Sequence, residues 1–259
     1  RLVGTLREVL ALAREELRPH DLLLDPQGNF KSATVNLASR VRHRVGFAPE
    51  LGSELNHWSL TARVGLSDPR VHRVRRSLAL LEAMGLDTSG PVARFEVSAE
   101  GQLAADRTLE RIGLEPGRFV VLHPGASASA QHKLWPAERY RHLAVRVRDE
   151  LGLGALAVIG PQDAALASVL GTVAGGEPPL PVVAPPTLHA LGGLLARARA
   201  FVGSDSGPLH LAASLGLSSV GLFGPTDPRL HVPVGAPAWL VVKELRCGRC
   251  GASHCRHPV

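Results

Sequence analysis

The chain has 259 residues, of which 45% are hydrophobic and 20% are charged, a composition typical of a folded protein rather than a disordered one. This length predicts two domains or one large domain, because domains commonly hold about 100–150 residues. The 29 basic and 23 acidic residues leave a net charge of +6, which favours an anionic partner such as a nucleotide, a phosphorylated glycolipid or a nucleic acid. Aromatic residues make up only 4% of the chain, too few for the stacking platforms of single-strand binders, so we expect no nucleic-acid partner.

The first third of the chain contains one strand-loop-helix unit. Apolar spacing predicts helices over residues 6–17 and 72–84, buried strands at 22–24 and 45–47, and a helix that Ser32 caps. The stretch from Pro49 to Pro69 has no clear period. Residues 86–97 contain Gly90-Pro91 and are the predicted linker, so we predict an N-terminal domain of residues 1–90 and a C-terminal domain of residues 91–259.

The C-terminal domain alternates short apolar runs with helical patterns, which predicts an α/β fold with a parallel sheet. The predicted helices cover residues 98–112 and 136–151 and a segment that Thr187 caps. The predicted strands are residues 119–122, 156–159, 201–203 and 220–223, with a weaker candidate at 182–183. Ligands of such sheets bind beyond the carboxyl ends of the strands, so the loops there are the candidate sites.

The first candidate loop follows the strand at 119–122. Gly125, Ser127 and Ser129 are small and let backbone N–H groups approach an anion, while Lys133 adds a positive charge for phosphate oxygens. A flexible surface loop with a solvated lysine is the alternative.

Two further loops follow the strands at 201–203 and 220–223. Asp205 can accept ribose hydroxyls, and Ser206, Gly207 and His210 lie where a helix begins, a position that suits a diphosphate. The alternative is that Asp205 or Ser206 only caps that helix and that His210 is structural. The third loop contains Thr226. No loop has a Walker or G-x-G-x-x-G pattern, which disfavours ordinary NTPases and dehydrogenases.

Together these loops resemble glycosyltransferase family 9, the ADP-heptose:lipopolysaccharide heptosyltransferases. The matching segments are His-Pro-Gly-Ala at 123–126, Lys-Leu-Trp-Pro at 133–136, Ser-Asp-Ser-Gly-Pro-Leu-His at 204–210, Phe-Gly-Pro-Thr-Asp-Pro at 223–228 and Asp-Pro-Gln-Gly-Asn-Phe-Lys-Ser at 25–32. The resemblance implies a GT-B architecture, in which two Rossmann-like domains face each other across a cleft. It also implies inverting transfer of heptose, or a related sugar, from ADP-heptose to a hydroxyl of a lipopolysaccharide-core-like glycan or glycolipid, without a cofactor or an essential metal.

The resemblance also assigns roles to residues. It implies that Lys133 and the loop of Gly125, Ser127 and Ser129 contact the diphosphate of the donor. The nucleotide sugar would be held by Asp205, Ser206, Gly207 and His210, with Thr226 lining the same crevice. On the acceptor side, the resemblance implies Gln27 and Lys31.

The catalytic base of the family is an aspartate in a Gly-Asp loop after the first N-terminal strand, and this sequence has no match for it. The sequence begins with Arg1 and its only methionine is Met84, so we expect the opening strands of the N-terminal domain to be missing. Asp25 is a possible substitute base, although aspartates at strand ends are more often structural. The alternatives are a catalytically silent nucleotide-sugar-binding protein and a basic nucleic-acid-binding protein.

Two remaining features bear on location and metals. The three C-terminal cysteines are too few for a disulfide framework and fit a reducing cytoplasm. Because His254 and His257 lie beside them, a zinc site is the alternative, but we expect no metal. We predict a cytoplasmic protein, with peripheral contact at the inner face of the inner membrane as an option. Two arginine groups are candidates for that contact: Arg40, Arg42 and Arg44, and Arg73, Arg75 and Arg76.

Overall fold

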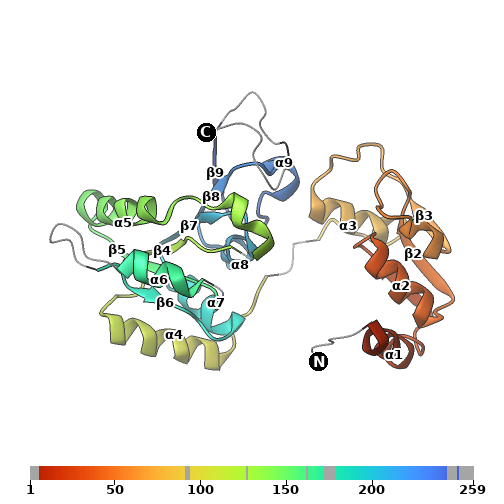
Figure 1. The fold of residues 1–259 in the computed structure, drawn as a ribbon, viewed down its shortest axis with the longest axis horizontal. Coiled ribbons are helices and arrows are strands. Elements are labelled where there is room, and N and C mark those ends of the chain that lie inside the picture. The colour runs from red at the N-terminus through yellow and green to blue at the C-terminus, as the bar shows by residue number, and fades with distance from the viewer. Residues whose placement is uncertain are drawn as a thin grey trace. The chain divides into compact units, whose positions relative to one another are not determined.

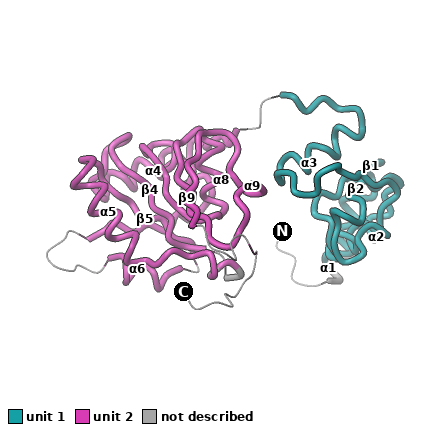
Figure 2. The backbone as a smooth tube through the Cα atoms, turned by 90° about the horizontal axis from the view of Figure 1, so that it is seen from above, with its two compact units in different colours: residues 1–91 teal, residues 92–259 magenta. Residues whose placement is uncertain are grey.

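The chain folds into two compact units, residues 1–91 and residues 92–259, shown in different colours in Figure 2. The structure is a computed structural model, and it describes residues 6–90, 94–126, 128–161, 163–171, 179–243 and 250. Within these ranges, no helix combines the length and the apolar character needed to cross a bilayer.

Unit 1 is built on a three-stranded parallel sheet in the order β1-β2-β3. Its strands are β1 (Leu22–Asp25), β2 (His43–Phe47) and β3 (Ala62–Val64). Its helices are α1 (Leu6–Glu16), α2 (Phe30–Ser39), the short 3-10 helix η1 (Asn56–Ser59) and α3 (Arg73–Glu82). Phe47, Leu51 and Leu80 form a buried cluster that joins β2 to α3.

Unit 2 is built on a six-stranded sheet in the order β6-β5-β4-β7-β8-β9, and every pairing in it is parallel. The strands are β4 (Phe119–His123), β5 (Gly154–Val158), β6 (Val182–Val183), β7 (Ala200–Ser204), β8 (Ser219–Phe223) and β9 (Ala238–Val242). The helices are α4 (Ala99–Ile112), η2 (Ala128–Lys133), α5 (Ala137–Leu151), α6 (Ala164–Gly171), α7 (Leu188–Ala196), α8 (Gly207–Ser214) and α9 (Pro228–His231). Figure 1 shows this sheet with helices on both of its faces.

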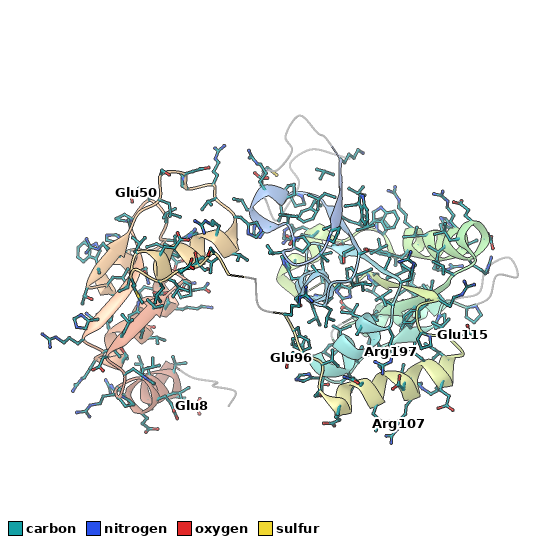
Figure 3. All side chains as sticks on the ribbon, turned by 180° about the vertical axis from the view of Figure 1, so that it is seen from behind. Glu8, Glu50, Glu96, Arg107, Glu115 and Arg197 are labelled. Carbon is teal, nitrogen blue, oxygen red and sulfur yellow. The ribbon has the colours of Figure 1, made fainter. Side chains whose placement is uncertain are left out.

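The alternation of side chains along β4 explains why both faces of the sheet are covered. Every residue of β4 is buried. Phe119 and Val121 pack into a core with residues of α4, α7 and α8, whereas Val120 and Leu122 pack with residues of α5 and α6. An ion pair of 2.5 Å between Arg197, which follows α7, and Asp106 of α4 ties two helices of the first face together (Figure 3).

Most elements lie where the sequence predicts them. The helix predicted at 72–84 is α3, the one predicted at 98–112 is α4, and the predicted strands of unit 2 are β4 to β8. Six elements were not predicted, among them the helical segments η2, α6 and α9. The region without a clear period contains η1 and β3, and β9 adds an edge strand to the larger sheet.

Candidate functional site

A pocket of about 400 Å³ lies at the carboxyl-terminal edge of the sheet in unit 2. It opens where three neighbouring strands end, because β4 pairs with β5 on one side and with β7 on the other. The polar residues and glycines that line the pocket come from the ends of these strands and the loops after them. They are His123 at the end of β4, Lys133 after β4, Gly160 and Asp163 after β5, and Asp205, Ser206 and Gly207 after β7. The location is the one expected for a ligand site in an open parallel sheet.

An ion pair lies in the wall of this pocket. Lys133 Nζ is 2.7 Å from Asp205 Oδ2, and the Asp205 side chain is only 6% exposed. His210 Nε2 lies 3.8 Å from the other carboxylate oxygen of Asp205. Burial raises the pKa of Asp205, but the interactions with His210 and Lys133 outweigh it and hold the pKa well below its usual range. The carboxylate therefore stays ionised and keeps the lysine ammonium at the pocket.

The N-terminus of α8 also faces this pocket through Ser206, Gly207 and Pro208. The backbone of Ser206 is extended, and its hydroxyl donates to Ser204 O at 2.9 Å instead of capping the helix. A Cβ added to Gly207 would meet no atom within 4 Å, so there is room next to the first turn. Helix N-termini attract anions through their N–H groups and the helix dipole, and Lys133 adds a full charge beside this one.

Two further buried polar side chains line the pocket. His123, at the end of β4, has its Nδ1 atom 2.9 Å from Val158 O. Asp163 accepts a hydrogen bond from Gly160 N at 3.1 Å. A Cβ at Gly125 would lie 2.2 Å from Asp163 Oδ2, so this close approach requires glycine. Gly125, predicted as a donor contact, is not among the lining residues of this pocket, but its lack of a side chain lets the loops after β4 and β5 meet.

The pocket brings together several of the residues predicted to bind the donor. Lys133, Asp205, Ser206 and Gly207 line it, and His210 lies beside Asp205. Thr226 is not among its lining residues; its Oγ1 is buried and lacks a hydrogen-bond partner in the described part of the chain.

Two predicted residues lie beyond what the structure describes, and two others were missed. Ser127 lies outside the described residues, as does the side chain of Ser129. His123 and Asp163 line the pocket but were not predicted as site residues. The signal for Asp163 was available, because the Gly-Pro-Gln-Asp segment at 160–163 follows a predicted strand just as the chosen loops do.

The predicted acceptor residues lie in unit 1. Gln27, in the loop after β1, and Lys31, in the first turn of α2, are both exposed. The helix start between them is well defined, because Asn29 and Ser32 form reciprocal capping hydrogen bonds and Glu54 accepts a hydrogen bond from Phe30 N at 2.9 Å.

Asp25 has a structural environment that does not suit a catalytic base. It is 3% exposed. One oxygen accepts from the backbone N–H groups of Gln27 and Gly28, and the other accepts from the side-chain amides of Asn36 and Asn56 at 2.7 and 2.8 Å. Burial raises the pKa of Asp25, but the hydrogen bonds from Gly28, Asn56 and Asn36 outweigh it, so the pKa is lowered. A carboxylate with both oxygens engaged and a lowered pKa is a poor proton acceptor.

Three of the six arginines considered for membrane contact have interaction partners within unit 1. Arg44 donates to Ser59 O at 2.7 Å, Arg75 pairs with Glu82, and Arg76 donates to Leu51 O and stacks on the Phe47 ring. Four of the six, Arg40, Arg42, Arg73 and Arg75, are exposed.

Most of the candidate ligands of the alternative zinc site lie outside the residues that the structure describes. Cys247, Cys255, His254 and His257 lie outside the described ranges, and Cys250 is an exposed free thiol. Among the residues that the structure does describe, no group of three or more His, Cys, Asp or Glu side chains is placed to hold a metal ion.

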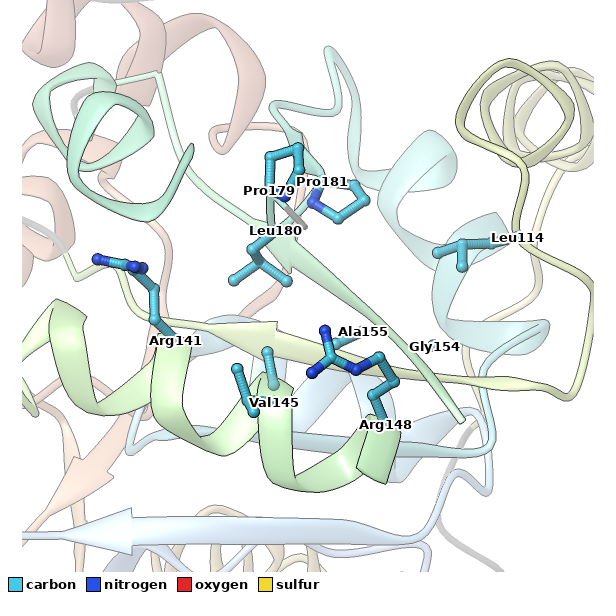
Figure 4. A pocket seen from close by; sticks show the side chains of 10 residues that line it. Leu114, Arg141, Val145, Arg148, Gly154, Ala155, Pro179, Leu180 and Pro181 are labelled. Atoms are coloured by element: carbon cyan, nitrogen blue, oxygen red, sulfur yellow. The ribbon is translucent and has the colours of Figure 1, made fainter. Parts of the chain in front are cut away.

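A second pocket of about 180 Å³ lies at the opposite end of β5, next to Gly154 and Ala155 where the strand begins (Figure 4). Leu180 and the prolines on either side of it supply part of its apolar lining, and Arg141 and Arg148 of α5 border it. Because the two pockets lie at opposite ends of this strand, the second one is separate from the loops discussed above.

Comparison with known proteins agrees with this arrangement. The sequence pattern of the family described as "Glycosyltransferase family 9 (heptosyltransferase)" matches residues 9–258. Lipopolysaccharide heptosyltransferase 1 of Pseudomonas aeruginosa is 28% identical over 92% of this chain and 64% of its own length, so the chain spans less than two thirds of that relative.

Solved structures give the same result for the fold. The structure of Escherichia coli ADP-heptose lipopolysaccharide heptosyltransferase II is 27% identical and has a TM-score of 0.69, covering 94% of this chain and 74% of that one. A family 9 glycosyl transferase of Veillonella parvula, 22% identical, has a TM-score of 0.76 over 93% of this chain and 69% of its own, which shows the fold. The predicted GT-B fold class is confirmed by these matches and by the two parallel α/β units. The chain therefore belongs to glycosyltransferase family 9, the heptosyltransferase family.

Proposed function

We propose that this protein transfers a heptose, or a closely related sugar, from ADP-heptose to a hydroxyl of a lipopolysaccharide-core glycan, with inversion at the anomeric carbon. The C-terminal domain, residues 91–259, binds the nucleotide sugar, and the N-terminal domain, residues 1–90, binds the acceptor. Membership in the family and the names of the relatives, which are lipopolysaccharide heptosyltransferases, support this assignment. A cytoplasmic location and peripheral membrane contact stay predictions.

The observation that carries the proposal is the placement of Lys133 beside the N-terminus of α8 in a pocket of about 400 Å³. The ammonium and the positive end of the α8 dipole both attract the oxygens of a diphosphate. Asp205, held ionised beside them, is an acceptor for hydroxyl groups of the nucleotide sugar. One pocket thus offers a site for the anionic centre of the donor and a site for its hydroxyls.

The same groups account for the chemistry of transfer. The acceptor oxygen attacks the anomeric carbon, the bond from that carbon to the diphosphate oxygen breaks, and ADP leaves with the bonding electrons. Negative charge grows on the diphosphate during this step, so Lys133 and the N-terminus of α8 bind the transition state more strongly than the ground state. The acceptor loses its proton to a base, which we leave unassigned.

Gln27 and Lys31 are the proposed acceptor contacts. Both are exposed at the start of α2, where Lys31 offers a charge to an anionic glycolipid and Gln27 offers an amide to sugar hydroxyls. The acceptor contacts can be tested separately from donor binding. We expect Gln27→Ala and Lys31→Ala to raise the KM for the acceptor and to leave the affinity for ADP unchanged.

A nucleotide-sugar-binding protein without transferase activity is the second candidate. The engaged carboxylate of Asp25 favours it, because the only aspartate suggested as a substitute base is occupied by four hydrogen bonds. Release of ADP from ADP-heptose in the presence of a heptose-deficient lipopolysaccharide acceptor would decide against this candidate.

The direct test of donor binding is calorimetric titration of the protein with ADP, UDP and GDP at moderate salt. We expect ADP to bind most tightly, and we expect Asp205→Ala to weaken ADP binding at least about tenfold. Equal affinity for the three nucleotides, or unchanged binding in the variant, would contradict the assignment of this pocket to an ADP-linked donor.

A further inference from the structure

His123 is a buried titratable residue of the donor pocket to which the proposed mechanism gives no role. It ends β4, its residue surface is only 6% exposed, and it lines the same pocket as Lys133 and Asp205. The Phe201 ring lies nearby, with its centroid 6.4 Å from that of the imidazole. A buried imidazole of this kind needs partners for both ring nitrogens, and among the described residues only Nδ1 has one, Val158 O.

The contact with Val158 determines which nitrogen carries the proton. Nδ1 lies 2.9 Å from the carbonyl oxygen of Val158, and a carbonyl oxygen only accepts hydrogen bonds. Nδ1 is therefore the protonated nitrogen of the neutral ring, and Nε2 has a free lone pair. Burial lowers the pKa of His123 and outweighs the opposing effects of Val158 O and Asp163, so the neutral form is favoured. Nε2 is then an acceptor and not a donor.

The polar groups of the pocket fall into two sets. Lys133 and the N-terminus of α8 donate hydrogen bonds or carry positive charge, which suits phosphate oxygens. Acceptors are offered by His123 and Asp163, which come from β4 and the loop after β5, and by Asp205 beside Lys133. A nucleotide sugar has the same division, since its diphosphate only accepts hydrogen bonds whereas the hydroxyls of its ribose and its sugar can donate them.

Taking the proposed donor as the ligand, we propose that His123 is a specificity-determining residue whose Nε2 atom accepts a hydrogen bond from a hydroxyl group of the nucleotide sugar. The contact with Val158 positions the ring for this role, and the tautomer that it imposes makes the site select a hydroxyl donor over a further phosphate oxygen. An anion at Nε2 would be disfavoured, because the lone pair of the neutral ring repels it.

Two substitutions separate this role from a merely structural one. His123→Asn keeps an amide N–H that can donate to Val158 O but has no acceptor at the position of Nε2, whereas His123→Gln can place its carbonyl oxygen near that position. We expect His123→Asn to weaken ligand binding about 3- to 10-fold, the range for one neutral hydrogen bond, and His123→Gln to retain most of the affinity. Equal losses in the two variants, or no loss in His123→Asn, would overturn the proposal.

The choice of ligand identifies which hydroxyl is involved. If His123→Asn weakens the binding of ADP and ADP-heptose equally, the hydroxyl belongs to the ribose; if it weakens only ADP-heptose, the hydroxyl belongs to the transferred sugar. Both outcomes support the proposal. If wild-type protein binds neither ligand, the proposed function itself fails, a result distinct from wild-type binding that His123→Asn leaves intact.

A spectroscopic measurement on the wild-type protein removes the dependence on variants that fold. In ¹⁵N-labelled protein, the long-range proton–nitrogen correlations of the imidazole distinguish a protonated Nδ1 from a bare Nε2. We expect His123 to show this tautomer without ligand and its Nε2 resonance to shift when ADP-heptose is added. A resonance of the opposite tautomer, or of a doubly protonated ring at neutral pH, would contradict the proposal.

Discussion

Lys133 and Asp205 form an ion pair of 2.7 Å although 72 residues separate them along the chain. The pair forms because Lys133 ends the segment after β4, Asp205 follows β7, and these two strands are neighbours in the sheet. The carboxylate is nearly inaccessible while the lysine side chain is 20% exposed. Asp205 thereby keeps the lysine charge at the mouth of the pocket, where a ligand can reach it.

Replacing Lys133 by alanine should weaken ADP binding about 10- to 100-fold, because a charge-assisted hydrogen bond to phosphate contributes about 1.5–3 kcal/mol. The loss should be smaller at high salt, where screening reduces the contribution of the lysine in the wild-type protein. Calorimetric titration at two salt concentrations measures both effects.

Lys243→Ala is the matched control for this variant. Lys243 is an exposed lysine of the same unit that follows β9, so its removal changes the net charge equally. If the two alanine variants lose the same affinity, the effect of Lys133 comes from overall charge and not from contact with the ligand.

Replacing Asp25 by asparagine should destabilise unit 1 by about 2–4 kcal/mol, because a buried carboxylate that accepts four hydrogen bonds would be exchanged for an amide. Thermal unfolding of Asp25→Asn against Asp21→Asn, a change at an exposed aspartate just before β1, measures this loss. A fully stable Asp25→Asn variant that binds ADP but has lost transferase activity would instead favour a catalytic role for Asp25.

The pH dependence of stability should also report on Asp25. Its pKa is lowered in the folded protein from an ordinary value of 3.8. The stabilisation is therefore complete above about pH 4 and is lost as the pH falls through the folded-state pKa below that. Acid unfolding followed by circular dichroism should show this dependence in wild-type protein and a weaker one in Asp25→Asn.

Replacing Gly125 by alanine should weaken ADP binding and destabilise unit 2 by about 1–3 kcal/mol, since the new methyl group would overlap the buried carboxylate of Asp163. The control is Gly171→Ala at the end of α6, where an added Cβ meets no atom within 4 Å. Unchanged affinity and unfolding temperature in Gly125→Ala would show that the loops after β4 and β5 do not meet as described.

Tyr140 offers a test of packing beside the site, because it is the only tyrosine in the chain. It is fully buried, and burial raises its pKa from 10.0 to about 12, with a smaller opposing effect from the Ser204 hydroxyl. Its ultraviolet absorbance should titrate near pH 12 in folded protein and near pH 10 in denaturant.

The same shift predicts a loss of stability at high pH. Between pH 10 and 12 the unfolded chain ionises its phenol while the folded protein does not, so the free energy of unfolding should decrease across this range. In Tyr140→Phe the decrease should be smaller. A tyrosine that titrates near pH 10 in the folded protein would contradict the buried position.

Much of the larger unit follows from local sequence patterns. The run Phe119–Leu122 predicts a buried strand because it is continuously apolar, and the structure buries alternate residues on opposite faces of the sheet. Strand β3 was missed because its three residues, Ala62–Val64, are mostly exposed and include an arginine. Strand β9 was missed although Ala238–Val242 is a continuous apolar run like those of the predicted strands. It lies at the edge of the sheet, and its side chains are largely exposed, among them Trp239 at 60%.

The candidate site was harder to predict than the fold because it depends on the order of strands. A pattern of alternating strands and helices predicts which residues follow a strand, and in this way it placed Lys133, Asp205 and Ser206 in loops at one edge. It does not predict that β4 lies between β5 and β7, the arrangement that brings Asp163 against Gly125. Contacts between distant loops therefore required the structure.

The central claim is that the pocket at the ends of β4, β5 and β7 binds ADP and its sugar derivative. Hydrogen exchange measured by mass spectrometry, with and without saturating ADP, tests it most directly because it locates the bound ligand along the chain. We predict slower exchange in peptides covering residues 123–133 and 203–210, and unchanged exchange around Arg141 and Arg148 at the second pocket. Protection confined to the second pocket or to unit 1, with none in these two loops, would contradict the claim.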